Sequence, residues 1–170
     1  MLPVLPLDRY LNGPLSELKT AILNTQKPRV GDVRLRDFAS TASKPSGVYV
    51  FCNAAQGGTP LYVGKASSRS FAERIPMHFD PRPLSWMNNF TRKFNGQERF
   101  RGIYADALAH AFDQYLILIG LDIVPAADAA AQRARICKLE TILRRYLQPE
   151  LNAGKPHRDF CDDALISNLL

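Results

Sequence analysis

Short apolar runs on either side of a glycine- and proline-containing turn mark the middle of the chain. Residues 48–51 and 61–63 are rich in β-branched and aromatic side chains, and residues 57–60 read Gly-Gly-Thr-Pro between them. Two such runs predict a β-hairpin whose loop is longer than the tight two-residue kind. Residues 115–119 form another apolar run, which we interpret as a third strand, although its composition also allows a helix.

The clearest helical pattern covers residues 129–147 and ends before Pro149. At 100° per residue, one side of this helix carries an apolar stripe. The stripe consists of Ile136, Leu139, Leu143, Tyr146 and Leu147. Glu140 falls on the edge of the stripe, where a half-buried carboxylate is costly unless a cation or hydrogen bonds meet it. A divalent metal ion or a basic side chain would both satisfy this requirement.

Helical patterns also flank the hairpin. Pro14 followed by apolar residues at 15, 18, 22 and 23 predicts an amphipathic helix with proline in its first turn. Ser70 with Glu73 three residues later is typical of a capping box, which predicts the start of another helix. Further helices are predicted over residues 33–39, 86–94, 105–112 and 160–170.

These elements divide the chain into three parts. Residues 41–46 have the composition of a linker, so residues 1–43 are predicted to form a helical N-terminal extension. Residues 44–156 form the main domain, with an insertion at about 80–113. Residues 157–170 are predicted to form a C-terminal helix that packs on the body.

Composition restricts the class of protein without defining its function. The 170 residues include 46% hydrophobic and 22% charged side chains, as expected for a globular chain with a real core. The net charge of +6 favours an anionic partner as much as a solvated basic surface. Three widely spaced cysteines, Cys52, Cys137 and Cys161, form neither a zinc motif nor a disulfide framework, so a cytoplasmic location is expected. Neither a membrane-spanning stretch nor a signal peptide is predicted.

Two tyrosines in the predicted hairpin stand beside glycines. Tyr49 and Tyr62 would ordinarily pack their rings on the core and leave their hydroxyls at an edge. Gly47 and Gly64 mark positions where a ligand or another backbone can approach closely. Lys65 follows directly and would add positive charge at the same place.

Placed in chain order, a set of polar residues resembles the GIY-YIG nuclease family. The set consists of Gly47-Val48-Tyr49, Tyr62-Val63-Gly64, Arg74, His78, Glu140, and Asn152 after Pro149. The segment from Tyr62 to Ala66 is especially similar to the catalytic domain of the bacterial excision-repair incision subunit, and the family also includes homing and restriction endonucleases. The resemblance covers residues 47 to about 155.

The resemblance implies an α/β (α+β) fold with a small, mainly antiparallel three-stranded sheet flanked by helices. It also implies an endonuclease that hydrolyses DNA, with Mg²⁺ or Mn²⁺ held by Glu140. Arg74 would brace the phosphoryl oxygens, and Tyr49 would contact the attacking water with help from Tyr62 and His78. Asn152 would position a catalytic side chain or the backbone.

The chain departs from the family pattern in two ways. Arg74 lies twelve residues after Tyr62, further than in compact members, so Arg69 is a rival for the catalytic guanidinium. Pro76 falls between Arg74 and His78 and disfavours one regular helix that carries both.

Other readings of the same residues remain open. The residues predicted to contact nucleic acid are Lys65, Arg69, Arg92 and Lys93. The alternative function is a GIY-YIG-like domain that binds nucleic acid without cutting it. The basic stretch at residues 80–113 is equally consistent with a solvated face. The N-terminal helices are candidates for a homodimer contact or for a partner protein.

Overall fold

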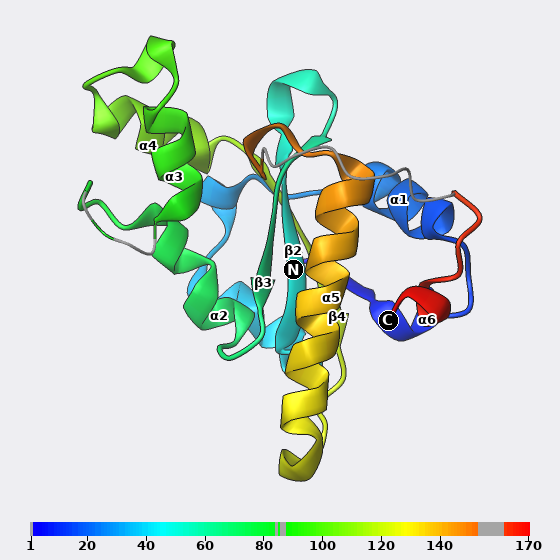
Figure 1. Cartoon of the computed structure of the whole chain (residues 1–170). Helices are drawn as coiled ribbons and strands as arrows, with labels where there is room; N and C mark the ends of the chain where they lie inside the picture. Colours follow the sequence, from blue (N-terminus) through cyan, green and yellow to red (C-terminus); the bar gives the residue numbers. More distant parts are fainter. Residues whose placement is uncertain (1, 84, 86–87, 153–161) are drawn as a thin grey trace.

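The protein is built around one mixed β-sheet of four strands (Figure 1). A computed structural model describes residues 2–83, 85, 88–152 and 162–170. The strands are β1 (Val4–Pro6), β2 (Ser46–Asn53), β3 (Thr59–Ala66) and β4 (Tyr115–Leu121). Their order is β1-β4-β2-β3, with β1 parallel to β4 and the other neighbours antiparallel. The α/β class expected from the sequence is therefore confirmed.

The central hairpin forms where the sequence predicts it. Strands β2 and β3 pair so that Tyr49 lies opposite Gly64 and Phe51 lies opposite Tyr62. The connection contains Gly57 and Gly58, both with positive φ. Glycine adopts this conformation readily, so the chain can reverse its direction between the two strands. The apolar run at residues 115–119, whose composition also allowed a helix, is a strand: it lies within β4, which pairs with β2.

A fourth strand was not expected from the sequence. Val4 pairs in parallel with Leu118, and Pro6 ends the strand after three residues. A strand this short, at the sheet edge and bounded by prolines, carries no recognisable alternation. Residues of the predicted N-terminal extension therefore share the sheet with the main domain.

Six α-helices are seen in the described residues. They are α1 (Leu15–Asn24), α2 (Phe71–Arg74), α3 (Asn89–Asn95), α4 (Tyr104–Phe112), α5 (Ala129–Leu147) and α6 (Ile166–Leu169). α5 has the predicted bounds, and the predicted capping box opens α2, because Ser70 and Glu73 satisfy each other's backbone N–H groups. The predicted helix at 33–39 is a 3₁₀ segment, Leu35–Thr41.

Two predicted helices extend outside the described residues. The predicted helix at 86–94 includes Trp86 and Met87, and the predicted tail helix includes Phe160 and Cys161, all four of which lie outside them. Within the described part, the corresponding helices are α3 and α6, each shorter than its prediction.

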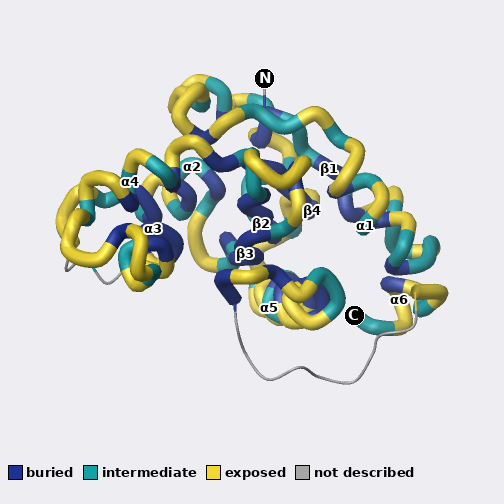
Figure 2. Tube along the Cα trace, turned by 90° about the horizontal axis from the view of Figure 1, so that it is seen from above, coloured by how far each residue is buried: buried dark blue, intermediate teal, exposed yellow. Residues whose placement is uncertain are grey.

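The sheet separates two hydrophobic layers (Figure 2). One layer is mainly aliphatic and joins α1, α5 and α6 to the sheet, while the other is rich in aromatic rings and joins α2, α3 and α4. Alternation along β2 supplies both: Val48 and Val50 enter the aliphatic layer, and Tyr49 and Phe51 enter the aromatic layer.

Candidate active site

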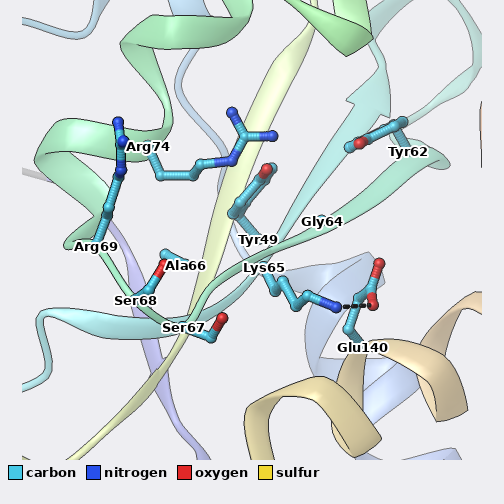
Figure 3. A pocket seen from close by; sticks show the side chains of 10 residues that line it. All are labelled: Tyr49, Tyr62, Gly64, Lys65, Ala66, Ser67, Ser68, Arg69, Arg74 and Glu140. Atoms are coloured by element: carbon cyan, nitrogen blue, oxygen red, sulfur yellow. Dashed lines mark hydrogen bonds and ion pairs between the residues drawn. The ribbon is translucent and has the colours of Figure 1, made fainter. Parts of the chain in front are cut away.

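A cavity of about 350 Å³ opens where the hairpin, α2 and α5 meet, at the β3 edge of the sheet (Figure 3). Its lining includes four of the six residues predicted to be catalytic, together with two predicted cationic contacts. The lining residues are Tyr49, Tyr62, Gly64, Lys65, Ala66, Ser67, Ser68, Arg69, Arg74 and Glu140. Residues from β2, β3, α2 and α5, which are far apart in the sequence, therefore share one small space.

The ring of Tyr49 sits against the backbone of Gly64. Tyr49 is fully buried, with 0% of its surface exposed, and it projects from the centre of β2. A Cβ atom at Gly64 would lie 2.4 Å from both the Cζ and the hydroxyl oxygen of Tyr49. Because such a contact is too close, glycine at this position is what lets the phenol reach the cavity.

His78 does not line the cavity but lies behind Tyr49. Its side chain is fully buried, and its Nε2 atom is 2.6 Å from the hydroxyl oxygen of Tyr49. α2 ends at Arg74, and His78 follows in a 3₁₀ turn, Pro76–Phe79. The interruption expected from Pro76 is therefore confirmed.

Burial controls the protonation of the phenols. It raises the pKa of Tyr49 well above its usual range, and the neighbouring Tyr62 adds to the increase while Arg74 opposes it. Burial likewise raises the pKa of Tyr62, again against Arg74. Without additional positive charge, both hydroxyls therefore keep their protons at neutral pH.

Arg74 is the better placed of the two candidate arginines. Its charge acts on Tyr49, Tyr62 and His78 alike, and its side chain points toward the Tyr49 ring (Figure 3). Arg69 also lines the cavity, but its Nη1 atom donates to the sulfur of Met77 at 3.2 Å.

Glu140 reaches the cavity from α5 as a buried carboxylate with two cationic partners. Its Oε2 atom is 3.1 Å from the Nζ atom of Lys65, and its Oε1 atom is 3.5 Å from the Nη1 atom of Arg144. Burial alone would lower the pKa of Lys65, but the hydrogen bond and charge of Glu140 outweigh burial and raise the pKa. Both requirements of a buried carboxylate, charge compensation and hydrogen bonding, are met by these two residues.

The donor set is compatible with a magnesium ion that shares its ligands with a substrate. Among the described residues, no three His, Cys, Asp or Glu side chains converge on one point. Mg²⁺ commonly takes one or two protein carboxylates and completes its shell with waters and phosphate oxygens. Glu140 is the single carboxylate among the cavity-lining residues just described, so it is the residue that would hold such an ion.

Asn152 contacts the sheet rather than the cavity. Its side-chain oxygen accepts a hydrogen bond from the N–H of Val63, and its Nδ2 atom donates to the carbonyl of Val63 at 3.0 Å. Because β3 is an edge strand, both Val63 groups would otherwise lack a partner in the sheet. Asn152 thus holds the backbone between Tyr62 and Gly64.

The remaining predicted nucleic-acid contacts lie outside the cavity. Arg92 and Lys93 are exposed on α3. Sequence reasoning did not single out Arg144, although its spacing of four residues from Glu140 on one helix was a usable signal. Sequence reasoning also missed that α3 supports His78. The backbone N–H of Phe90 donates to Nδ1 of His78, and a main-chain contact of this kind leaves no trace in the sequence.

Comparisons with protein-family models, curated proteins and solved structures found no match. Every helix in the described part of the chain is too short or too polar to span a bilayer.

Proposed function

We propose that this protein is a metal-dependent endonuclease that hydrolyses DNA phosphodiester bonds, within a GIY-YIG-like fold. One observation supports this proposal above all: a single cavity contains two phenols, two guanidinium groups, an ammonium and a carboxylate. Three cationic side chains, Lys65, Arg69 and Arg74, against one carboxylate, Glu140, make the cavity suitable for a phosphate.

Arg74 binds and orients the phosphoryl group in this proposal. Its planar, permanently charged fork donates two parallel hydrogen bonds to phosphate oxygens and stabilises charge that builds up in the transition state. Lys65 offers a second positive charge, because it lines the same cavity while its Nζ atom pairs with Glu140. A divalent ion, when bound, supplies Lewis-acid stabilisation of the phosphate and leaving oxygens.

In this proposal, Tyr49 contacts the attacking water. Its oxygen can accept a proton only after its pKa falls, because burial holds the hydroxyl in the protonated form. Arg74 already acts in the required direction on this group. Tyr62 lies in the same lining, with its ring stacked at 6.5 Å from the Tyr49 ring.

The ion pairs of Glu140 favour a second candidate function, nucleic-acid binding without cleavage. A carboxylate already satisfied by Lys65 and Arg144 is a common structural arrangement and needs no metal ion. The positive cavity would then bind a phosphate backbone without any chemistry.

A plasmid-nicking assay separates the two functions. Supercoiled DNA is incubated with the wild-type chain and with Glu140→Gln, in Mg²⁺ or Mn²⁺ and in chelator; Glu150→Gln, which alters an exposed carboxylate, is the matched control. We expect wild type and Glu150→Gln to nick the plasmid, and Glu140→Gln to bind it without nicking.

Salt-sensitive binding without nicking by the wild type would instead support the binding function, because phosphate contacts release counterions. If the wild type neither binds nor nicks DNA at low salt, both functions are refuted.

A further inference from the structure

Helix α3, part of the predicted insertion, holds His78 from two directions. The backbone N–H of Phe90 donates to the Nδ1 atom of His78 at 3.2 Å, and the hydroxyl of Thr91 donates to the carbonyl of His78 at 2.7 Å. Phe90 is the second residue of α3, so its N–H has no carbonyl partner within the helix. The imidazole therefore satisfies a donor that would otherwise be buried without a partner.

This contact fixes where the imidazole proton resides. A neutral imidazole has one N–H and one acceptor nitrogen. Because Nδ1 accepts from Phe90, the proton is on Nε2, and Nε2 faces the hydroxyl oxygen of Tyr49 at 2.6 Å. His78 is thus the donor in that short hydrogen bond, and Tyr49 is the acceptor.

The surroundings of His78 keep it uncharged. Aromatic rings enclose it, with Phe51 at 5.6 Å, Tyr62 at 5.5 Å and Phe90 at 6.4 Å between centroids. Burial lowers its pKa well below the usual range, and the positive charge of Arg74 lowers it further.

We propose that His78 is a positioning residue, locked by α3 as the Nε2–H tautomer, whose donated hydrogen bond turns the hydroxyl proton of Tyr49 toward the cavity. Its effect on cleavage depends on the proposed nuclease function. The same bond stabilises negative charge on the Tyr49 oxygen, so His78 assists Tyr49 as a donor and does not take its proton. The free lone pair and the hydroxyl proton of Tyr49 then face water or phosphate.

The tautomer is measurable without any substrate. In ¹⁵N-labelled full-length protein at neutral pH, we expect the His78 ring to show a protonated Nε2 and an unprotonated Nδ1. Thr91→Val, which removes the hydroxyl at nearly constant volume, should weaken the anchor and increase exchange of the Nε2 proton with water. Thr91→Ser should restore the wild-type signal.

The catalytic consequence is tested by two substitutions at the same position. Gln presents a side-chain N–H donor and Phe presents none, so His78→Gln should retain more cleavage than His78→Phe, by about tenfold or more.

Failure of this inference is distinguishable from failure of the proposed function. An Nδ1–H tautomer, or a charged imidazole at neutral pH, overturns it even if the protein cuts DNA. The expected tautomer in a protein that cuts no DNA supports the positioning of Tyr49 and rejects the proposed function. If His78→Phe does not fold, the wild-type spectrum still decides.

Discussion

The two faces of the sheet are built from the same strands but tolerate different changes. On one face, Val48 and Val50 pack with aliphatic side chains of α1 and α5. On the other face, Tyr49 and Phe51 pack among rings that include His78, whose polar atoms are all hydrogen bonded. Aliphatic packing depends on volume and pattern, whereas a buried polar network also depends on the direction of each hydrogen bond. We therefore expect volume changes in the aliphatic layer to affect stability, and changes to polar groups around Tyr49 to affect activity.

The cavity lies where the two faces meet. β3 is an edge strand, so residues on its two sides reach the same opening. Tyr62 and Gly64 face the aromatic layer, and Lys65, one residue further, reaches Glu140 of α5 on the other side. At this sheet edge, side chains of opposite faces can therefore act together.

The largest expected loss of stability comes from the aliphatic face. Leu18 of α1 is fully buried there, away from the cavity lining. Leu18→Ala should lower the free energy of unfolding by about 2–5 kcal/mol, because the cavity it leaves cannot fully collapse. Urea denaturation measures the loss, and nicking per folded molecule should stay at the wild-type rate.

The matched control is Leu18→Met, which conserves volume and should cost less than about 1.5 kcal/mol. A large loss of nicking rate in folded Leu18→Ala would show that the two faces are not separable.

The reverse pattern is expected at Arg74. Arg74→Ala should lower the nicking rate by about 10²–10³, the usual cost of removing one preorganised electrostatic partner. Its stability to urea should stay close to that of the wild type, because Arg74 lines an open cavity instead of the core. Arg69→Ala is the comparison: if it is the inactive variant, the catalytic guanidinium is Arg69.

Gly64→Ala should damage both properties. The added methyl group would meet the Tyr49 ring at 2.4 Å, so the ring or the strand must shift. We expect about 1–3 kcal/mol of lost stability from overpacking, together with loss of nicking. Gly96→Ala at the end of α3 is the control, since its Cβ atom would lie 3.6 Å from the nearest atom. Equal behaviour of the two variants would contradict the packing of Tyr49 on Gly64.

The smallest expected effect is a pH dependence of stability. Because the native pKa of His78 lies below its unfolded value, the unfolded chain takes up the proton first as pH falls. Stability contributed by neutral His78 is therefore complete above about pH 6.5, and it decreases by about 1.4 kcal/mol per pH unit below that value until the native pKa is reached.

Urea denaturation of the wild type and of His78→Gln at pH 7.5, 6.5 and 5.5 measures this difference. The two stabilities should converge as the pH falls. His110→Gln is the control. Because His110 is partly exposed, most of the pH dependence of the free energy of unfolding should remain in this variant. Parallel curves for wild type and His78→Gln would show that His78 is not held neutral.

Local patterns predicted the elements that do not depend on distant contacts. Helix α5 and the β2–β3 hairpin follow from periodicity and turn chemistry within short windows, and both were confirmed. The short helix α2 was located by its capping box. β1 escaped prediction because a three-residue strand next to prolines is stabilised by parallel pairing with β4, more than a hundred residues away.

The same division applies to the cavity. The residue types and their order identified Tyr49, Tyr62, Arg74 and Glu140, and these four line one opening. The partners of Glu140 were left open between a metal ion and a basic side chain, and the structure pairs it with two basic side chains. Whether Glu140 meets Lys65 depends on how α5 packs against β3, and the sequence of one helix does not specify that packing.

The sequence by itself determined which chemical groups are available and where short-range structure begins and ends, because propensity, periodicity and capping act over a few residues. Only the tertiary structure decided which nitrogen of His78 bears the proton, and that Asn152 serves the backbone of the edge strand. Both depend on main-chain N–H and C=O groups, which every residue shares and which acquire a role only once distant segments pack together.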